Sequence, residues 1–165
     1  MKRLLSLILL AVILFSFSGC STVSYDINKY NEILNTFTCL PAVDELGEYT
    51  DLNFKYLKRV EALFFFPETY TLRVRYGEKE FKNQKEFIDN NYKFQQSRSF
   101  ETDFFTFRTL ASDKYYCIDF PKQIVFIGIS KTDNEIVYIA FYDTDLDYIE
   151  GTLQEFLEEE CGWEE

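Results

Sequence analysis

Three aspartates at alternate positions, Asp143, Asp145 and Asp147, form the best candidate for a metal-binding group in the sequence. Alternate acidic side chains are the pattern with which a loop surrounds calcium. However, Tyr148 stands where such a loop needs glycine, and Gln154 stands where it needs a bidentate glutamate. We therefore expect Asp143 or Asp145 to cap the helix that follows, and Asp147 to lie in its first turn, where negative charge is favourable. We expect neither a resident metal nor another cofactor.

Two arginines, Arg73 and Arg75, are the best candidates for contact with a ligand or partner. Their spacing of two places both guanidinium groups on one face of a strand expected over residues 69–76. Guanidinium groups form paired hydrogen bonds with carboxylates and phosphates. We expect Arg73 and Arg75 either to bind an anionic ligand or partner, or to pair with acidic side chains across the sheet.

Catalytic signatures are missing from the sequence. The chain has no histidine, which excludes Ser-His-Asp and Cys-His catalysis and histidine-ligated zinc. Neither a P-loop nor a GxGxxG motif occurs. We expect that the protein is not an enzyme.

The N-terminus carries the most specific motif of the chain. Lys2 and Arg3 precede an apolar run from Leu4 to Phe17, about 14 residues long, which is shorter than the roughly 20 residues that span a membrane. This is the pattern of a secretory signal peptide. The run ends in Phe17-Ser18-Gly19-Cys20, which resembles the lipobox of bacterial lipoproteins, although leucine is usual where Phe17 stands.

This resemblance implies that Cys20 receives a diacylglyceryl group and that a signal peptidase cleaves before it. Acyl chains of the palmitate type would then hold the protein on the extracytoplasmic face of the cell membrane. The expected organisation is a signal peptide over residues 1–19, a lipidated tether over 20–25 and a single domain over 26–165.

Charge and cysteine content limit the partners. The net charge of −11 leaves no basic face for nucleic acid, so we expect no nucleic-acid partner. Beyond Cys20, the chain has Cys39, Cys117 and Cys161. Cys117 is expected in the core, and a disulfide between Cys39 and Cys161 is an open alternative. Trp163 is expected to anchor the acidic C-terminal tail to the domain.

Hydrophobic periodicity predicts an α+β fold. The expected helices cover residues 26–37, 77–95 and 145–160. The expected strands cover residues 52–58, 61–66, 69–76, 104–110, 114–120, 123–130 and 135–142, with a loop over 96–103. The last two strands are apolar on both faces and are expected in the middle of the sheet. Short connections favour a mainly antiparallel sheet with the helices packed on one face, which is a two-layer sandwich.

Three functions remain open. Residues 40–47, 127–130 and 142–148 are similar to segments of small lipoproteins from low-GC Gram-positive bacteria, and this resemblance implies no activity. We expect a membrane-anchored interaction module that binds an envelope protein. The alternatives are a lipoprotein that binds a sugar, peptide or metal ion, and an immunity or inhibitor lipoprotein. A concave pocket with several polar side chains would favour ligand binding, whereas a flat apolar patch or an open sheet edge would favour protein contact.

Overall fold

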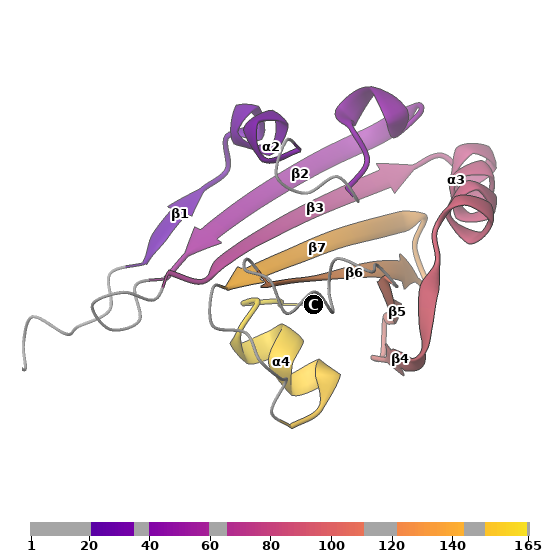
Figure 1. The fold of residues 1–165 in the computed structure, drawn as a ribbon. Coiled ribbons are helices and arrows are strands. Elements are labelled where there is room, and N and C mark those ends of the chain that lie inside the picture. The colour runs from indigo at the N-terminus through magenta and orange to yellow at the C-terminus, as the bar shows by residue number, and fades with distance from the viewer. Residues whose placement is uncertain (1–20, 35–39, 60–65, 111–121, 144–150, 165) are drawn as a thin grey trace, which may run out of the picture.

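The computed structural model describes residues 21–34, 40–59, 66–110, 122–143 and 151–164. Their elements are β1 (Thr22–Ser24), α2 (Ile27–Ile33), the 3-10 turn η1 (Val43–Glu45), β2 (Tyr49–Lys58), β3 (Glu68–Tyr76), α3 (Glu78–Asn91), β4 (Phe94–Glu101), β5 (Phe105–Leu110), β6 (Lys122–Ser130), β7 (Glu135–Asp143) and α4 (Leu153–Glu159). The strands form one sheet in the order β1-β2-β3-β7-β6-β5-β4 (Figure 1). Every pair of neighbouring strands is antiparallel. The fold is therefore α+β with a mainly antiparallel sheet, as expected.

β7 lies at the centre of the sheet, between β3 and β6. Its side chains from Glu135 to Phe141 are all buried. Successive side chains of a strand point to opposite faces, so a strand that is apolar throughout needs cover on both sides. The central position expected for this strand and its neighbour β6 is confirmed.

One face of the sheet is covered by α2 and α3, and we call it the closed face. Tyr30 of α2 and Ile88 of α3 pack there against Leu72 and Val74 of β3 and Tyr138 of β7. These five side chains are at most 2% exposed. Asp26 caps α2, because its carboxylate accepts a hydrogen bond from the backbone N–H of Asn28.

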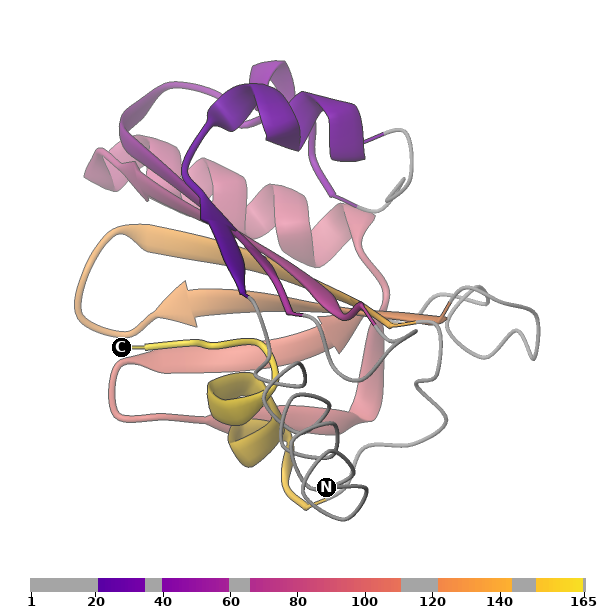
Figure 2. The same ribbon diagram turned by 90° about the vertical axis from the view of Figure 1, so that its left-hand side faces the viewer.

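The opposite face carries α4, and we call it the α4 face (Figure 2). Phe156 and Leu157 of α4 pack with Phe126 of β6 and Ile139 of β7 in a second core cluster. The helices therefore do not share one face, which differs from the expected two-layer arrangement. The reason lies in β6 and β7, whose apolar side chains on both faces require a helix on each.

Two other elements differ from expectation. Residues 96–101, expected as a loop, belong to β4, which pairs only with β5 within the described residues. The last helix begins at Leu153 and is capped by the side chain of Thr152, not by Asp143 or Asp145. Residues 144–150 lie outside the described residues, as do 61–65 and 114–120, where strands were expected. Within the described part of the chain, no helix has both the length and the apolar character to span a membrane.

Candidate functional site

The α4 face changes from apolar to polar between β7 and β3. On β7, Val137 and Ile139 belong to the second core cluster. On β3, their direct neighbours in register are Arg73 and Thr71. β2 continues this polar half of the face with Asn53, which pairs with Arg73 in the register. Polar side chains therefore line up over β2 and β3, beside an apolar half that α4 covers.

A groove with a volume of about 460 Å³ lies over this polar half of the α4 face. Its lining includes the polar and charged residues Asn53, Lys55, Thr71, Arg73 and Glu164 and the aromatic residues Tyr25 and Trp163. They come from β2, from β3, from the C-terminal segment and from the residue that follows β1. Segments that are distant in sequence therefore meet at this groove.

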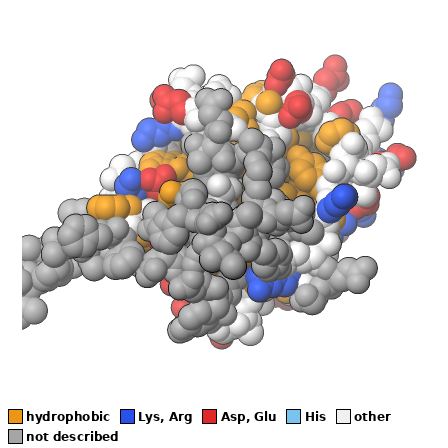
Figure 3. All heavy atoms as spheres, in the orientation of Figure 1, with side chains coloured by type: hydrophobic (Ala, Val, Ile, Leu, Met, Phe, Trp, Pro, Cys, Tyr) orange, Lys and Arg blue, Asp and Glu red, His pale blue; other side chains and the backbone are white. Residues whose placement is uncertain are grey.

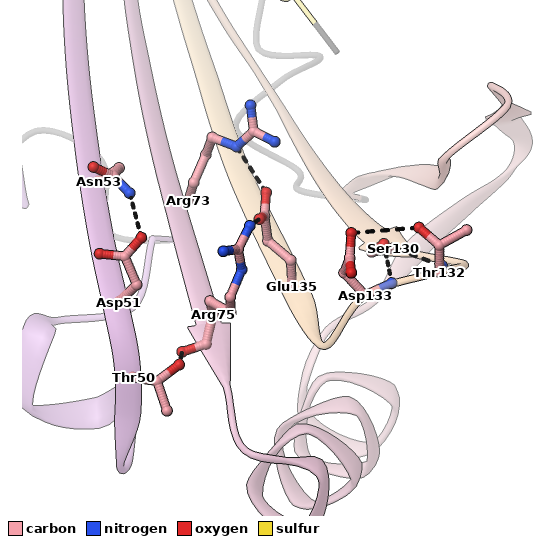
Figure 4. Close-up of polar contacts among 9 residues, drawn as sticks. All are labelled: Thr50, Asp51, Asn53, Arg73, Arg75, Ser130, Thr132, Asp133 and Glu135. Atoms are coloured by element: carbon pink, nitrogen blue, oxygen red, sulfur yellow. Dashed lines mark hydrogen bonds and ion pairs between the residues drawn. The ribbon is translucent and has the colours of Figure 1, made fainter.

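Arg73 contacts one acidic neighbour, Glu135, and two aromatic neighbours, Trp163 and Phe105. Its Nε donates to Oε1 of Glu135 at 2.7 Å. Its guanidinium carbon lies 4.9 Å from the centre of the Trp163 ring, which is a cation–π contact. Figure 4 shows the two terminal nitrogens of Arg73 pointing away from Glu135. The Glu135 carboxylate and the Trp163 ring therefore fix the plane of the guanidinium group, while the edge formed by its two terminal nitrogens faces away from Glu135.

Arg75 shares the same carboxylate but not the groove. Its terminal nitrogen lies 3.1 Å from Oε2 of Glu135, so Glu135 bridges both arginines (Figure 4). The side chain of Glu135 is 7% exposed, whereas that of Arg75 is 54% exposed. The expected alternative of pairing across the sheet is therefore realised for both arginines. Only Arg73 also lines the groove.

The C-terminal segment is fastened to the sheet by specific contacts. Nζ of Lys55 donates to the carbonyl oxygen of Gly162 at 3.2 Å. Gly162 has a φ of 62°, in the left-handed region that favours glycine, and it directs the chain from α4 back over the sheet. The Trp163 ring packs edge-on against Phe105 and Phe107, with 5.5 Å between ring centres in each case. The expected anchoring role of Trp163 is confirmed.

Positive charge at the groove contrasts with the acidic chain around it. The net charge is −11. On the side of the molecule seen in Figure 3, Lys and Arg side chains of the described residues are scattered among Asp and Glu side chains. Among the described residues, the groove lining contains two cations, Lys55 and Arg73, and one carboxylate, Glu164. An anion would therefore meet a more favourable surface here than the net charge suggests.

The other candidate residues do not form a site within the described residues. Asp143 ends β7 and is partly buried, while Asp145, Asp147 and Cys20 lie outside the described residues. No group of three or more potential metal ligands occurs in the part of the chain that the structure describes. Cys161 is a buried free thiol, and burial raises its pKa well above the usual value. Cys39 and Cys117 are also outside the described residues.

A second polar group lies on the closed face and is structural in character. The hydroxyl of Tyr70 donates to Glu68, and the ring of Tyr70 stacks on Tyr56 with 5.1 Å between centres. Lys58 forms an ion pair with Glu68 at 2.6 Å. Burial, with the Glu68 charge as a second cause, raises the pKa of Tyr56 to about 12. The tyrosines therefore remain protonated hydrogen-bond donors at neutral pH.

Sequence reasoning identified part of the groove. Arg73 was predicted from the alternation in β3, and Trp163 was expected to be an anchor. Lys55 and Asn53 were missed, although their two-residue spacing in β2 repeats the spacing of the arginines. Comparisons with family models, with curated proteins and with solved structures find no match to this chain. Its function must therefore be argued from its own residues.

Proposed function

We propose that the protein is a non-catalytic binding protein of the cell envelope that recognises its ligand in the groove over β2 and β3. A lipid on Cys20 would hold it at the extracytoplasmic face of the membrane. Support for this anchor comes from the signal peptide and the lipobox-like Phe17-Ser18-Gly19-Cys20. β1 begins at Thr22, two residues after Cys20, and Tyr25 lines the groove. The binding site would therefore lie close to the membrane surface.

The observation that carries the binding function is the groove itself. Its volume of about 460 Å³ falls within the range of small-molecule sites, roughly 300–1,000 Å³. Polar, charged and aromatic side chains from distant parts of the chain line it, which is the composition of a site that orients a ligand. Among the functions expected from the sequence, these features favour ligand binding over a flat protein-docking surface.

Lipid attachment is tested by labelling host cells with a palmitate analogue and separating their membranes. Wild type should be labelled and should remain with the membrane fraction. Cys20→Ala should lose both properties, whereas the control Cys161→Ala should keep them, because it removes a thiol outside the lipobox. Label retained by Cys20→Ala would refute the anchor.

Binding in the groove is tested by crosslinking the full-length protein in membranes of its host and identifying what is bound by mass spectrometry. Asn53→Phe introduces a large side chain at an exposed position of the groove lining. Asn83→Phe makes the same change at an exposed position of α3, away from the groove. A bound species that is retained by Asn83→Phe but lost from Asn53→Phe supports the function. Equal recovery from both variants would refute it.

A further inference from the structure

We infer that the ligand of this groove is a small molecule with a single carboxylate beside an apolar or planar group. This inference rests on the proposed function and adds the chemical class of the ligand. It combines three features of the groove, which are the free edge of one guanidinium group, a second cation, and an aromatic wall.

The first feature is the orientation of Arg73. Its Nε is occupied by Glu135, and its two terminal nitrogens make no hydrogen bond to any other described residue. They point away from Glu135 (Figure 4). A guanidinium edge with two parallel N–H groups matches the two oxygens of a carboxylate. The contacts with Glu135 and Trp163 hold this edge in place before a ligand arrives, which lowers the entropic cost of binding.

The second feature is the charge of the surroundings. Arg73 and Lys55 contribute two positive charges to the lining and Glu164 contributes one carboxylate, while Glu135 pairs with Arg73 from outside the lining. Nζ of Lys55 already donates one hydrogen bond to the carbonyl oxygen of Gly162. It therefore contributes a positive charge to the groove and has N–H groups left to donate to a ligand. The rest of the protein is strongly acidic. Long-range repulsion therefore disfavours polyanions such as nucleic acid, while a small monoanion is affected much less.

The third feature is the aromatic wall next to Arg73. Trp163 is 5% exposed and lines the groove, and its ring lies beside the guanidinium group. Tyr25 lines the same groove and is 71% exposed. A carboxylate bound to Arg73 would place the rest of its molecule beside these rings. An apolar or planar group fits such a position, because it can stack on the exposed Tyr25 ring and contact the small exposed part of Trp163.

The single tryptophan of the chain makes the inference directly measurable. Because Trp163 is the only tryptophan and lines the groove, its fluorescence should change when a ligand binds there. The mature lipidated protein, which begins at Cys20, is titrated in nonionic detergent with N-acetylphenylalanine and with its neutral amide, and separately with glucuronate and its neutral amide. The two pairs distinguish an amino-acid-like source of the carboxylate from a sugar acid, and calorimetry checks each fluorescence change.

At least one acid should bind about tenfold or more tightly than its amide. Arg73→Gln should weaken binding of that acid about tenfold or more, and Lys55→Gln should weaken it less. Arg75→Gln is the matched control, because it removes the same charge from the same strand and also contacts Glu135, but it does not line the groove. Its affinity should stay within about twofold of wild type. Arg73→Lys keeps the charge and should still lose affinity, because the paired donors are absent.

Failure of the inference and failure of the proposed function give different results. Acid and amide bound equally well, with both lost in Asn53→Phe, would overturn the carboxylate assignment and leave binding in the groove intact. Equal losses in Arg73→Gln and Arg75→Gln would show only a long-range effect of charge and would also overturn the assignment. The assignment is equally overturned if neither acid binds. The proposed function itself fails if Asn53→Phe retains the species captured from membranes.

Discussion

The two faces of the sheet are built from the same strands but are completed differently. On the closed face, alternate residues of β2, β3, β7 and β6 are apolar, and one core runs beneath α2 and α3. On the α4 face, the core covers β5, β6 and β7 and stops before β3. Arg73 and Lys55 stand where the core would have continued. The groove lies over this part of the sheet.

Because the two faces differ, the side chains of one strand that stabilise the fold are not the ones that would bind a ligand. In β3, Leu72 and Val74 are buried on the closed face, while Arg73 and Arg75 face the other way. A strand with one dry and one wet face can support the core with one set of side chains and bind a ligand with the other. The substitutions below test how complete this separation is.

The largest difference in stability is expected between substitutions of Phe54 and Asn53, which are neighbours in β2 and point to opposite faces of the sheet. Phe54 is 5% exposed on the closed face and packs edge-on against Tyr30, with 5.6 Å between ring centres. Phe54→Ala should lower the free energy of unfolding by about 3–5 kcal/mol, because it leaves a cavity in the core. Asn53→Ala should change it by no more than about 0.5 kcal/mol. Urea denaturation measures both, and similar losses would contradict the separation of the two faces.

A smaller loss of stability is expected at the ion pairs of the α4 face. Glu135→Gln should lower the free energy of unfolding by about 1.5–3 kcal/mol, because Arg73 and Arg75 lose charged hydrogen-bond partners at a buried position. Glu101→Gln is the matched control. Glu101 pairs with Lys131 at 2.8 Å, but its side chain is 68% exposed, so the expected loss is below about 1 kcal/mol. Equal losses in urea denaturation would mean that the bridge between the arginines adds nothing to stability.

A still smaller effect is expected at the start of α4. Thr152→Ala should lower the free energy of unfolding by about 0.5–2 kcal/mol, because the Thr152 hydroxyl accepts a hydrogen bond from the backbone N–H of Glu155. Thr152→Ser keeps the hydroxyl and should retain most of the stability. In Thr152→Ala, amide hydrogen exchange should speed up relative to wild type more in α4 than in α3. An unchanged exchange rate in α4 would mean that packing of Phe156 and Leu157 alone holds this helix.

The alternation of β3, β6 and β7 was sufficient to predict much of the sheet. Because β6 and β7 are apolar at successive positions, their central place follows from the sequence. β4 was missed because its segment is polar, with Gln95, Arg98 and Ser99, and because within the described residues it pairs with β5 alone, so it does not show the apolar pattern of a central strand. The position of α4 on the opposite face was also missed, since periodicity shows which side of a helix is apolar but not which face of the sheet it covers.

The local sequence pattern predicted only part of the candidate site. Alternation singled out Arg73 and Arg75 but could not separate them, because only the tertiary fold places Arg73 beside Trp163. The contact between Lys55 and Gly162 joins residues 107 positions apart. No local property of either segment indicates that they meet. The groove therefore depends on the path of the C-terminal segment back over the sheet, and hydrophobic periodicity does not predict this path.

The last prediction concerns alkaline pH, at which the tyrosines of the two faces can be distinguished. The closed-face core contains Tyr56, Tyr70, Tyr76 and Tyr138, whereas the α4-face core has no tyrosine among its described members. Burial is the main cause that raises the pKa of Tyr56 to about 12, from 10.0 in its ordinary environment. It also raises the pKa values of Tyr70, Tyr76 and Tyr138.

Well below pH 10, tyrosine is protonated in both the folded and the unfolded chain, so tyrosine adds no pH dependence to the free energy of unfolding. Between pH 10 and about 12, the unfolded chain releases the Tyr56 proton and the folded chain retains it, so the free energy of unfolding falls as pH rises. Urea denaturation across this range should give a shallower fall for Tyr56→Phe. Cys161 on the α4 face also has a raised pKa, so Cys161→Ala removes its contribution. A fall that vanishes in Cys161→Ala and is unchanged in Tyr56→Phe would place the alkali-sensitive groups on the α4 face instead.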